Sequence, residues 1–158
     1  MPKGAPDGVG AAVDATLTAS RALLGVVARS VANALELVTP PQFRVLVILS
    51  AEGPLRTGTL AARMDAVPST FTRSLDRMEA GGWITRRENP DSRREVLVDL
   101  TESGRHLVEE ATARRRQEIR SVITHLSPDE RAAVIRGLTL FASAAGEPPI
   151  DDLLVPGL

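Results

Sequence analysis

The sequence predicts a mainly α-helical protein with one small β-hairpin. Apolar residues recur at every third or fourth position in the N-terminal, central and C-terminal parts of the 158 residues, as they do in amphipathic helices. Residues 83–101 instead alternate around a run of turn-forming residues, which is typical of two short strands. Prolines and a Gly-Gly pair mark the ends of several helical stretches. A hydrophobic content of 43% is sufficient for the core of one domain.

The N-terminal region is expected to form one long helix after a disordered start. Residues 1–10 contain Pro, Gly and Asp, and we predict that they are disordered. In residues 11–38 an apolar stripe with helical spacing predicts a single helix that ends before Thr39. This stripe consists of Val13, Leu17, Leu24, Val27, Val31, Leu35 and Val38.

Two further helices are expected between residues 39 and 67. Thr39 is placed to cap a helix that runs to about Leu49, because a proline follows it and Gln42 completes a capping box. Thr57 is expected to cap a second, short helix. The inner face of that helix carries Leu60, Ala61 and Met64. A tight connection then leads to Pro68, which suits the first position of the next helix because it has no N–H to leave unpaired.

The helix that begins at Pro68 has a buried stripe and a polar outer face. The stripe is formed by Phe71, Leu75 and Met78, and the helix is expected to stop at Gly81-Gly82. The residues off the stripe include Ser69, Thr70, Thr72, Arg73 and Arg77. Two short helices joined by a tight turn are typical of domains that place the second helix in the major groove of DNA. Small hydroxyls permit close approach, and an arginine can pair with guanine or with phosphate.

Residues 83–101 are predicted to form a wing, meaning a hairpin with a basic tip. The strands are expected at Trp83–Arg87 and Val96–Leu100, with Val96, Val98 and Leu100 on one face. The turn Asn89-Pro90-Asp91-Ser92 then projects the arginines away from the body. From residue 82 to residue 94 the acidic residues are outnumbered by Arg86, Arg87, Arg93 and Arg94. The hairpin is therefore locally positive although the formal net charge is −1, and its guanidinium groups suit phosphate or a narrow minor groove.

Two helices are expected after the wing. Thr101 opens a long helix whose inward residues are Leu107, Ala111, Ile119, Val122 and Leu126. A capping box at Ser127-Pro128-Asp129-Glu130 starts the last helix, and residues 146–158 form a tail. The terminal regions, 11–38 and 102–145, are long and apolar on one side, which favours a dimer. The alternative is that these helices pack on their own winged domain.

The run from Thr39 to about Leu107 resembles the MarR family of bacterial transcription regulators. The matching pieces are Leu60-Ala-Ala-Arg-Met, Pro68-Ser-Thr-Phe-Thr-Arg-Ser-Leu, Ala80-Gly-Gly-Trp-Ile-Thr-Arg-Arg and Leu100-Thr-Glu-Ser-Gly. The resemblance implies a winged helix-turn-helix lobe between long N- and C-terminal dimerisation helices, with residues 39–101 as the DNA-binding region. It also implies that bases and phosphates are contacted by Ser69, Thr70, Thr72 and Arg73, and that Arg94 is the inserted wing arginine.

Two positions depart from the family pattern. The wing tip usually carries Asp-x-Arg, whereas this chain has Ser92-Arg93-Arg94 with its acid at Asp91. The position before Pro68 is commonly a capping Ser, whereas Val67 forgoes roughly 1 kcal/mol of capping.

Several classes of function are disfavoured by the residues that the chain lacks or spaces apart. The chain has no Cys and only two His, His106 and His125, far apart in sequence. No metal site, phosphate-binding glycine loop or catalytic constellation follows, so we expect neither an enzyme nor a cofactor. No apolar run of membrane-spanning length and no signal peptide is recognised, and we expect a cytoplasmic protein without a membrane partner.

The sequence therefore predicts a DNA-binding transcriptional regulator. We expect a homodimer that binds a near-palindromic site in double-stranded DNA, with repression as the default because it is commoner in the resembled family. The resemblance also implies a small-molecule effector that binds between the dimerisation helices and the winged lobe. A protein with no effector is the open alternative. A second alternative is a winged helix that serves as a protein-interaction or dimerisation module without specific DNA binding.

Overall fold

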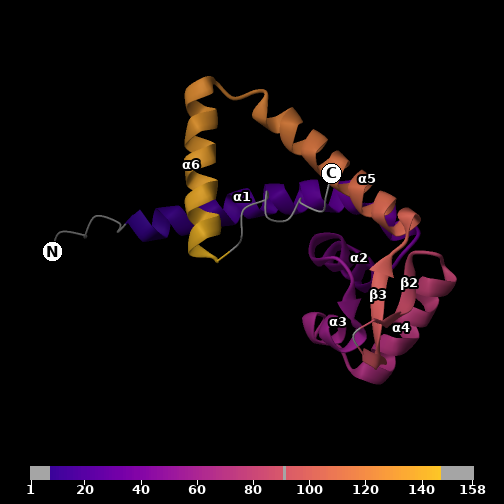
Figure 1. The fold of residues 1–158 in the computed structure, drawn as a ribbon. Helices are drawn as coiled ribbons and strands as arrows, with labels where there is room; N and C mark the ends of the chain where they lie inside the picture. The colour runs from indigo at the N-terminus through magenta and orange to yellow at the C-terminus, as the bar shows by residue number, and fades with distance from the viewer. Residues whose placement is uncertain (1–7, 91, 147–158) are drawn as a thin grey trace.

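The computed structural model describes residues 8–90 and 92–146, in which a small mixed lobe is attached to three long helices (Figure 1). This arrangement confirms the predicted mainly helical fold with a small hairpin. In chain order the elements are α1 (Gly8–Val31), the 3₁₀-helix η1 (Ala34–Glu36), α2 (Pro40–Glu52), β1 (Leu55–Arg56), α3 (Thr57–Arg63), α4 (Pro68–Ala80), β2 (Ile84–Asn89), β3 (Ser92–Leu100), α5 (Glu102–Ile123) and α6 (Pro128–Ala144).

The sheet is antiparallel, with strand order β1-β3-β2. Strands β2 and β3 form the wing, and the register shifts between Glu88 and Asn89. Strand β3 begins at Ser92, four residues earlier than the predicted Val96, because Ser92 pairs with Asn89 beyond the register shift. The predicted apolar face is confirmed for Val98 and Leu100, which are buried, whereas Val96 is 41% exposed because it lies nearer the wing tip, beyond the core.

The core lies inside the lobe. Its fully buried members come from α2, α3, α4 and the sheet, and they include Leu46, Leu49, Leu60, Leu75, Met78, Ile84 and Val98. The stripe predicted for α4 is confirmed, since Phe71, Leu75 and Met78 are all buried. Helix α5 adds Leu107, Val108 and Ala111 from its first half. The polar outer face of α4 is therefore set by a core that forms within one chain.

Local sequence signals fix most helix starts. The capping boxes at Thr39 with Gln42 and at Ser127 with Glu130 are both present, as predicted. Thr57 differs from the prediction: it is the first residue of α3 and not its cap, because Arg56 in β1 is extended up to that point. The Thr57 hydroxyl instead donates to the carbonyl of Val96 at 3.4 Å, which joins α3 to the wing.

The predicted N-terminal helix is wrong at both ends. Residues 8–10 belong to α1 and are not disordered, while residues 1–7 lie outside the described residues. The helix stops at Val31, and the chain turns through η1 before α2. This turn carries Ala34 and Val38 into the lobe core, where they are 3% and 4% exposed. A straight helix to residue 38 would have carried both residues away from the lobe.

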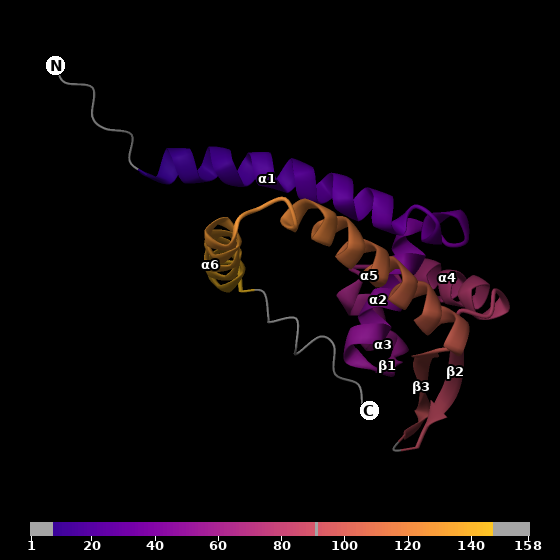
Figure 2. The same ribbon diagram turned by 90° about the horizontal axis from the view of Figure 1, so that it is seen from above.

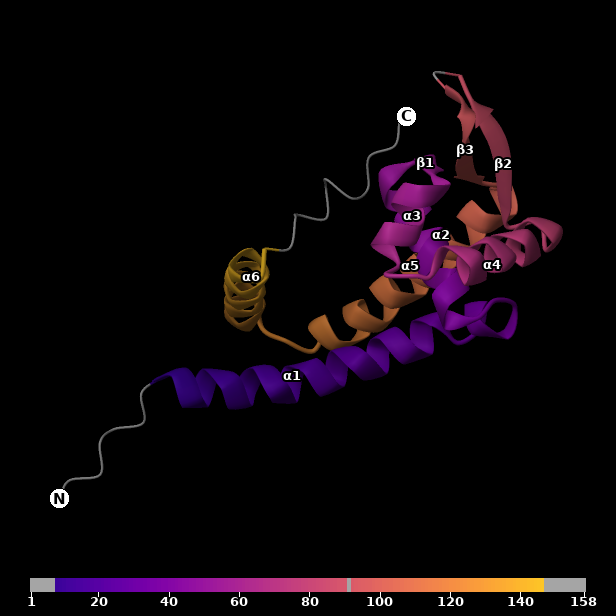
Figure 3. The same ribbon diagram turned by 90° about the horizontal axis from the view of Figure 1, so that it is seen from below.

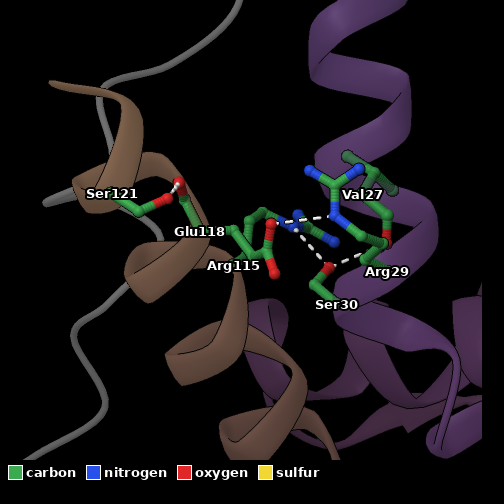
Figure 4. A network of polar contacts seen from close by, with 6 residues as sticks. All are labelled: Val27, Arg29, Ser30, Arg115, Glu118 and Ser121. Carbon is green, nitrogen blue, oxygen red and sulfur yellow. Dashed lines mark hydrogen bonds and ion pairs between the residues drawn. The ribbon is translucent and has the colours of Figure 1, made fainter. Parts of the chain in front are cut away.

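Helices α1 and α5 lie side by side and are joined by polar contacts (Figure 4). The Nε of Arg29 is 2.9 Å from a carboxylate oxygen of Glu118. The Nε of Arg115 donates to the hydroxyl of Ser30 at 3.5 Å, and this hydroxyl donates to the carbonyl of Val27. Ser30 is only 1% exposed, so these contacts hold the end of α1 against α5.

The start of α5 packs directly against the lobe. The Thr101 hydroxyl donates to the carbonyl of Gly82 at 2.6 Å, and it accepts from the amide of Gly104 at 3.1 Å. A Cβ at Gly104 would lie 2.1 Å from the carbonyl oxygen of Trp83, so only glycine fits there. The start of α5 is therefore packed closely against the residues that lead into the first wing strand.

The half of α1 that lies farther from the lobe and the whole of α6 are poorly covered by other parts of the chain. Helix α6 has no buried residue, and Figures 1 and 2 show it standing away from the lobe. Large apolar side chains exposed on these two helices include Val13, Leu17, Leu24, Ile135, Leu140 and Phe141. By length and composition α1 is apolar enough to cross a membrane, contrary to the expectation that no such run exists. An uncovered apolar surface of this kind is typical of an interaction site.

Candidate nucleic-acid interface

Helix α4 presents its polar residues together on one exposed side. Since Phe71, Leu75 and Met78 face the core, the opposite side of α4 faces outward. The five residues predicted to contact DNA from this helix are all exposed, namely Ser69, Thr70, Thr72, Arg73 and Arg77. Arg73 and Arg77 are four residues apart, so they lie one turn from each other on the same side. Within the described residues neither forms an ion pair.

The N-terminus of α4 is open in the way that the sequence predicted. Val67 occupies the cap position in an extended conformation and provides no side-chain hydrogen bond to the first turn. The first amides of a helix then remain as donors for an outside acceptor such as a phosphate oxygen. The helix ends at Ala80, and Gly82 with φ of 76° reverses the chain into the wing.

The wing extends from the lobe on the side away from α1, which the views from above and from below both show (Figure 2, Figure 3). Arg93 and Arg94 belong to the first residues of β3, beside the tip, but their side chains lie outside what the structure describes. Asp91 also lies outside the described residues. The prediction that Arg94 enters a minor groove therefore stays a prediction, while its backbone position beside the tip is as expected.

Arg86 is engaged within the lobe. Its Nε donates to a carboxylate oxygen of Glu79 at 2.8 Å, and one Nη donates to Asp76 at 2.7 Å. These hydrogen bonds lower the pKa of Glu79 below its usual value and raise the pKa of Arg86. Sequence reasoning placed Arg86 among the DNA contacts and missed both acids. The available signal was their spacing of three residues on α4, which puts both on one side of that helix.

An open hollow of about 610 Å³ separates α3, α4 and the wing. Its lining comprises Arg56, Thr57, Gly58, Thr59, Thr72, Arg86, Glu95 and Val96. A second hollow, of about 300 Å³, lies between α1 and α5 and is lined by Arg29, Ser30, Arg114, Gln117, Glu118 and Ser121. Neither has an aromatic lining residue. The described residues also contain no cluster of three or more His, Cys, Asp or Glu that could hold a metal ion.

Comparison with protein families gives one match. The model of the MarR family matches residues 38–96, which run from the end of η1 through α2, α3, α4 and β2 into β3. The match thus covers α4 and most of the wing.

Two of the similar proteins are transcriptional regulators of Bacillus subtilis. One is an uncharacterized HTH-type transcriptional regulator, YfiV, which is 33% identical over 66% of this chain and 65% of its own length. Another is the HTH-type transcriptional repressor MdtR, 32% identical over 68% of this chain and 70% of its own length. The chain thus spans about two thirds of the length of these relatives.

A solved structure extends the likeness to the long helices. The crystal structure of RV1404 from Mycobacterium tuberculosis is 43% identical in sequence, with a TM-score of 0.82. The match covers 92% of this chain and 100% of that one, so it includes the helices outside the lobe.

Proposed function

We propose, since this chain belongs to the MarR family of transcriptional regulators, that it represses transcription as a homodimer bound to a near-palindromic site in double-stranded DNA. Members of this family are not enzymes. The observation that supports the proposal best is the gathering of hydroxyl and guanidinium groups on the exposed side of α4, beside the wing. A polar helix face with an open N-terminus next to a basic ribbon fits a major groove and its flanking phosphates.

The proposed DNA contact of each predicted residue follows from its place on α4 or the wing. Ser69 and Thr70, in the first turn, approach the phosphate backbone, and Thr72 lies one position before Arg73 on the exposed side. Arg73 and Arg77 read a base or hold a phosphate. Arg93 and Arg94 reach the minor groove from the wing tip. Because the whole chain has a formal charge of −1, affinity rests on these few arginines and falls steeply with salt.

The homodimer follows from the uncovered apolar side chains of α1 and α6. Leu24 is 66% exposed and Leu140 is 71% exposed in the single chain, which is costly for a soluble protein. A second copy can cover both helices through a two-fold axis, which also places two α4 helices on one side of the assembly. Asp14, Arg21 and Arg29 interrupt α1, and its end is bound to α5, so we assign its apolar side to a partner chain and not to a membrane.

We include in this proposal a small-molecule effector that releases the protein from DNA, because the family resemblance implies one. Apart from Gly58 and Val96 in the first, both described hollows are lined by charged, hydroxyl and amide side chains. A molecule that enters either one would therefore carry polar or ionised groups, since polar lining groups that lose contact with water need a hydrogen-bonding partner. The place of action is the cytoplasm, where the chromosome of a bacterium lies.

A protein-interaction module without specific DNA binding is the second candidate. The observations that favour it are Ser92 at the position where the family carries an acid and the acidic net balance. Selection of bound fragments from random duplex DNA, followed by salt titration, separates the two. We expect enrichment of a near-palindrome and a steep loss of affinity with salt. Salt-sensitive binding without enrichment would contradict sequence-specific regulation, and no binding at low salt would leave the interaction module.

A further inference from the structure

We propose that Arg86, held by Glu79 and Asp76, is a positioning residue that sets the wing relative to the reader helix α4 and does not itself contact DNA. This inference rests on the proposed DNA-binding function. The three residues join two elements that must reach different parts of one duplex. We call them the wing clamp.

The wing clamp fixes both the side chain and the backbone of the strand. Glu79 accepts from the Nε of Arg86 at 2.8 Å with one carboxylate oxygen. Its other oxygen accepts from the backbone amide of Arg86 at 3.1 Å. Asp76 accepts from the Nη2 of the same guanidinium at 2.7 Å. A planar guanidinium held by two acids has little rotational freedom, so β2 is held at a defined place on α4.

Because of the position of the wing clamp, a small tilt there displaces the wing tip. Asp76 and Glu79 lie about one and two turns beyond Thr72 on α4, while Arg86 lies near the base of the wing. From Arg86 to Asn89 the strand rises about 10 Å, so a tilt of about 10° at the clamp would move the tip by about 2 Å. That displacement is larger than a hydrogen bond to DNA tolerates.

A second set of contacts holds the other side of the wing. Glu95 on β3 pairs with the Nε of Arg56 at 3.1 Å and accepts from the side-chain amide of Asn89 at 2.9 Å. Asn89 is only 5% exposed. The wing is thus held toward β1 by Glu95 and toward α4 by Arg86, and loss of the clamp removes the polar contacts on the α4 side.

The charges around Arg86 disfavour a direct phosphate contact. Two carboxylates surround one guanidinium, and the side chains of Asp76 and Glu79 are 55% and 37% exposed. An approaching phosphate meets a net charge of −1 and a side chain of Arg86 that is only 25% exposed. Arg73 and Arg77, by contrast, pair with no acid in the described part of the chain. Contact with Arg86 would require breaking its ion pairs first.

The test compares Arg86→Gln, Glu79→Gln and the double variant in the full chain. The probes are the duplex that the parent selects from random DNA and a scrambled duplex of equal length. We expect each single variant to bind the selected duplex about tenfold more weakly, and the double variant to bind no more weakly than either single one, because the two residues act as one unit. Binding to the scrambled duplex should change little. Glu79→Gln is the most informative variant. The wing clamp predicts weaker binding, whereas removal of a negative charge would strengthen DNA binding on electrostatic grounds alone.

Glu88→Gln is the matched control, because Glu88 is an exposed glutamate on β2 without an ion pair in the described residues. It removes the same charge and should leave affinity unchanged or slightly higher. Thermal midpoint, molecular mass and active fraction are measured for every variant. A merely unstable lobe would weaken binding to both duplexes equally, whereas loss of positioning lowers the ratio between them.

The results that overturn the wing clamp are distinct from those that overturn DNA binding. If Glu79→Gln binds the selected duplex as tightly as the parent or more tightly, the clamp is wrong. If Arg86→Gln weakens both duplexes equally and lowers the salt slope by about one, Arg86 is a phosphate contact instead. If the parent selects no sequence, the proposed function fails and the clamp fails with it.

Discussion

The lobe and the long helices around it differ in how they dispose of their apolar residues. The lobe closes a core in which Leu46, Leu60 and Leu75 are fully buried by residues of the same chain. On α1 and α6, by contrast, Leu17 and Leu140 remain 60% and 71% exposed. The same residue type thus serves two purposes. In the lobe it fixes the shape of the surface that we propose binds DNA, and in the long helices we propose that it packs against a second chain.

The largest expected effect separates the two regions by a matched leucine substitution. Leu75→Ala should lower the free energy of unfolding by about 2–5 kcal/mol, because it opens a cavity in a closed core. The effect should not depend on protein concentration. Leu24→Ala, on exposed α1, should act through the dimer, so its thermal midpoint should vary with concentration. If thermal unfolding at several protein concentrations shows equal and concentration-independent losses for both variants, the comparison is contradicted.

The joint between the regions is tested by a pair of glycine substitutions. Gly104→Ala should destabilise the protein by about 3 kcal/mol, because its Cβ would overlap the carbonyl of Trp83 at the start of α5. Gly58→Ala meets nothing within 4 Å and should be neutral or slightly stabilising. Thermal unfolding of both variants gives the comparison. An undisturbed Gly104→Ala would mean that the lobe and α5 are not rigidly joined.

Within the lobe, the reader helix and the wing tip should differ in kind. Arg73→Ala should weaken binding of the selected duplex by about 1–3 kcal/mol and relax its preference at one base, if the side chain reads a guanine as proposed. Arg94→Ala should weaken binding of all sequences alike, with helicity and molecular mass unchanged. Fluorescence anisotropy with the selected duplex and single-base variants measures both. If Arg94→Ala binds like the parent, the wing with Ser92 at its tip does not reach DNA.

The smallest effect concerns the pH dependence of stability. The hydrogen bonds from Arg86 lower the pKa of Glu79 in the folded state. Glu79 therefore contributes stability above its unfolded-state pKa, and this contribution is lost as pH falls through the lower folded-state pKa. Urea unfolding of the parent and Glu79→Gln should differ at neutral pH and converge at strongly acidic pH. The pKa of Glu130 is lowered as well, by the amide of Ser127, but this affects both proteins equally.

Local signals in the sequence were sufficient for most elements. The capping boxes, Pro68 and Gly82 act within a few residues, and the stripe of α4 reflects burial on one face. The break after Val31 had no such signal, because apolar spacing continues through Leu35 and Val38. What ends α1 is the burial of Ala34 and Val38 in a core that residues far along the chain provide.

The candidate site was predictable to a similar degree. Which residues of α4 face outward follows from its period, and all five predicted there are exposed. The spacing of Asp76 and Glu79 could place both acids on one side of α4, but it could not show that they pair with Arg86, which lies seven and ten residues away on another element. Exposed arginines on a strand look alike in sequence, whether they face a phosphate or a carboxylate of the same chain.

The central claim is that two lobes, joined by the long helices of a dimer, bind one duplex in a fixed register. It is tested most directly by inserting about five base pairs, half a helical turn, between the half-sites of the selected duplex. We predict two chains per parent duplex by sedimentation and a large loss of affinity for the lengthened one, since one α4 then faces away from its groove. One chain per duplex, or equal affinity for both duplexes, would contradict the account.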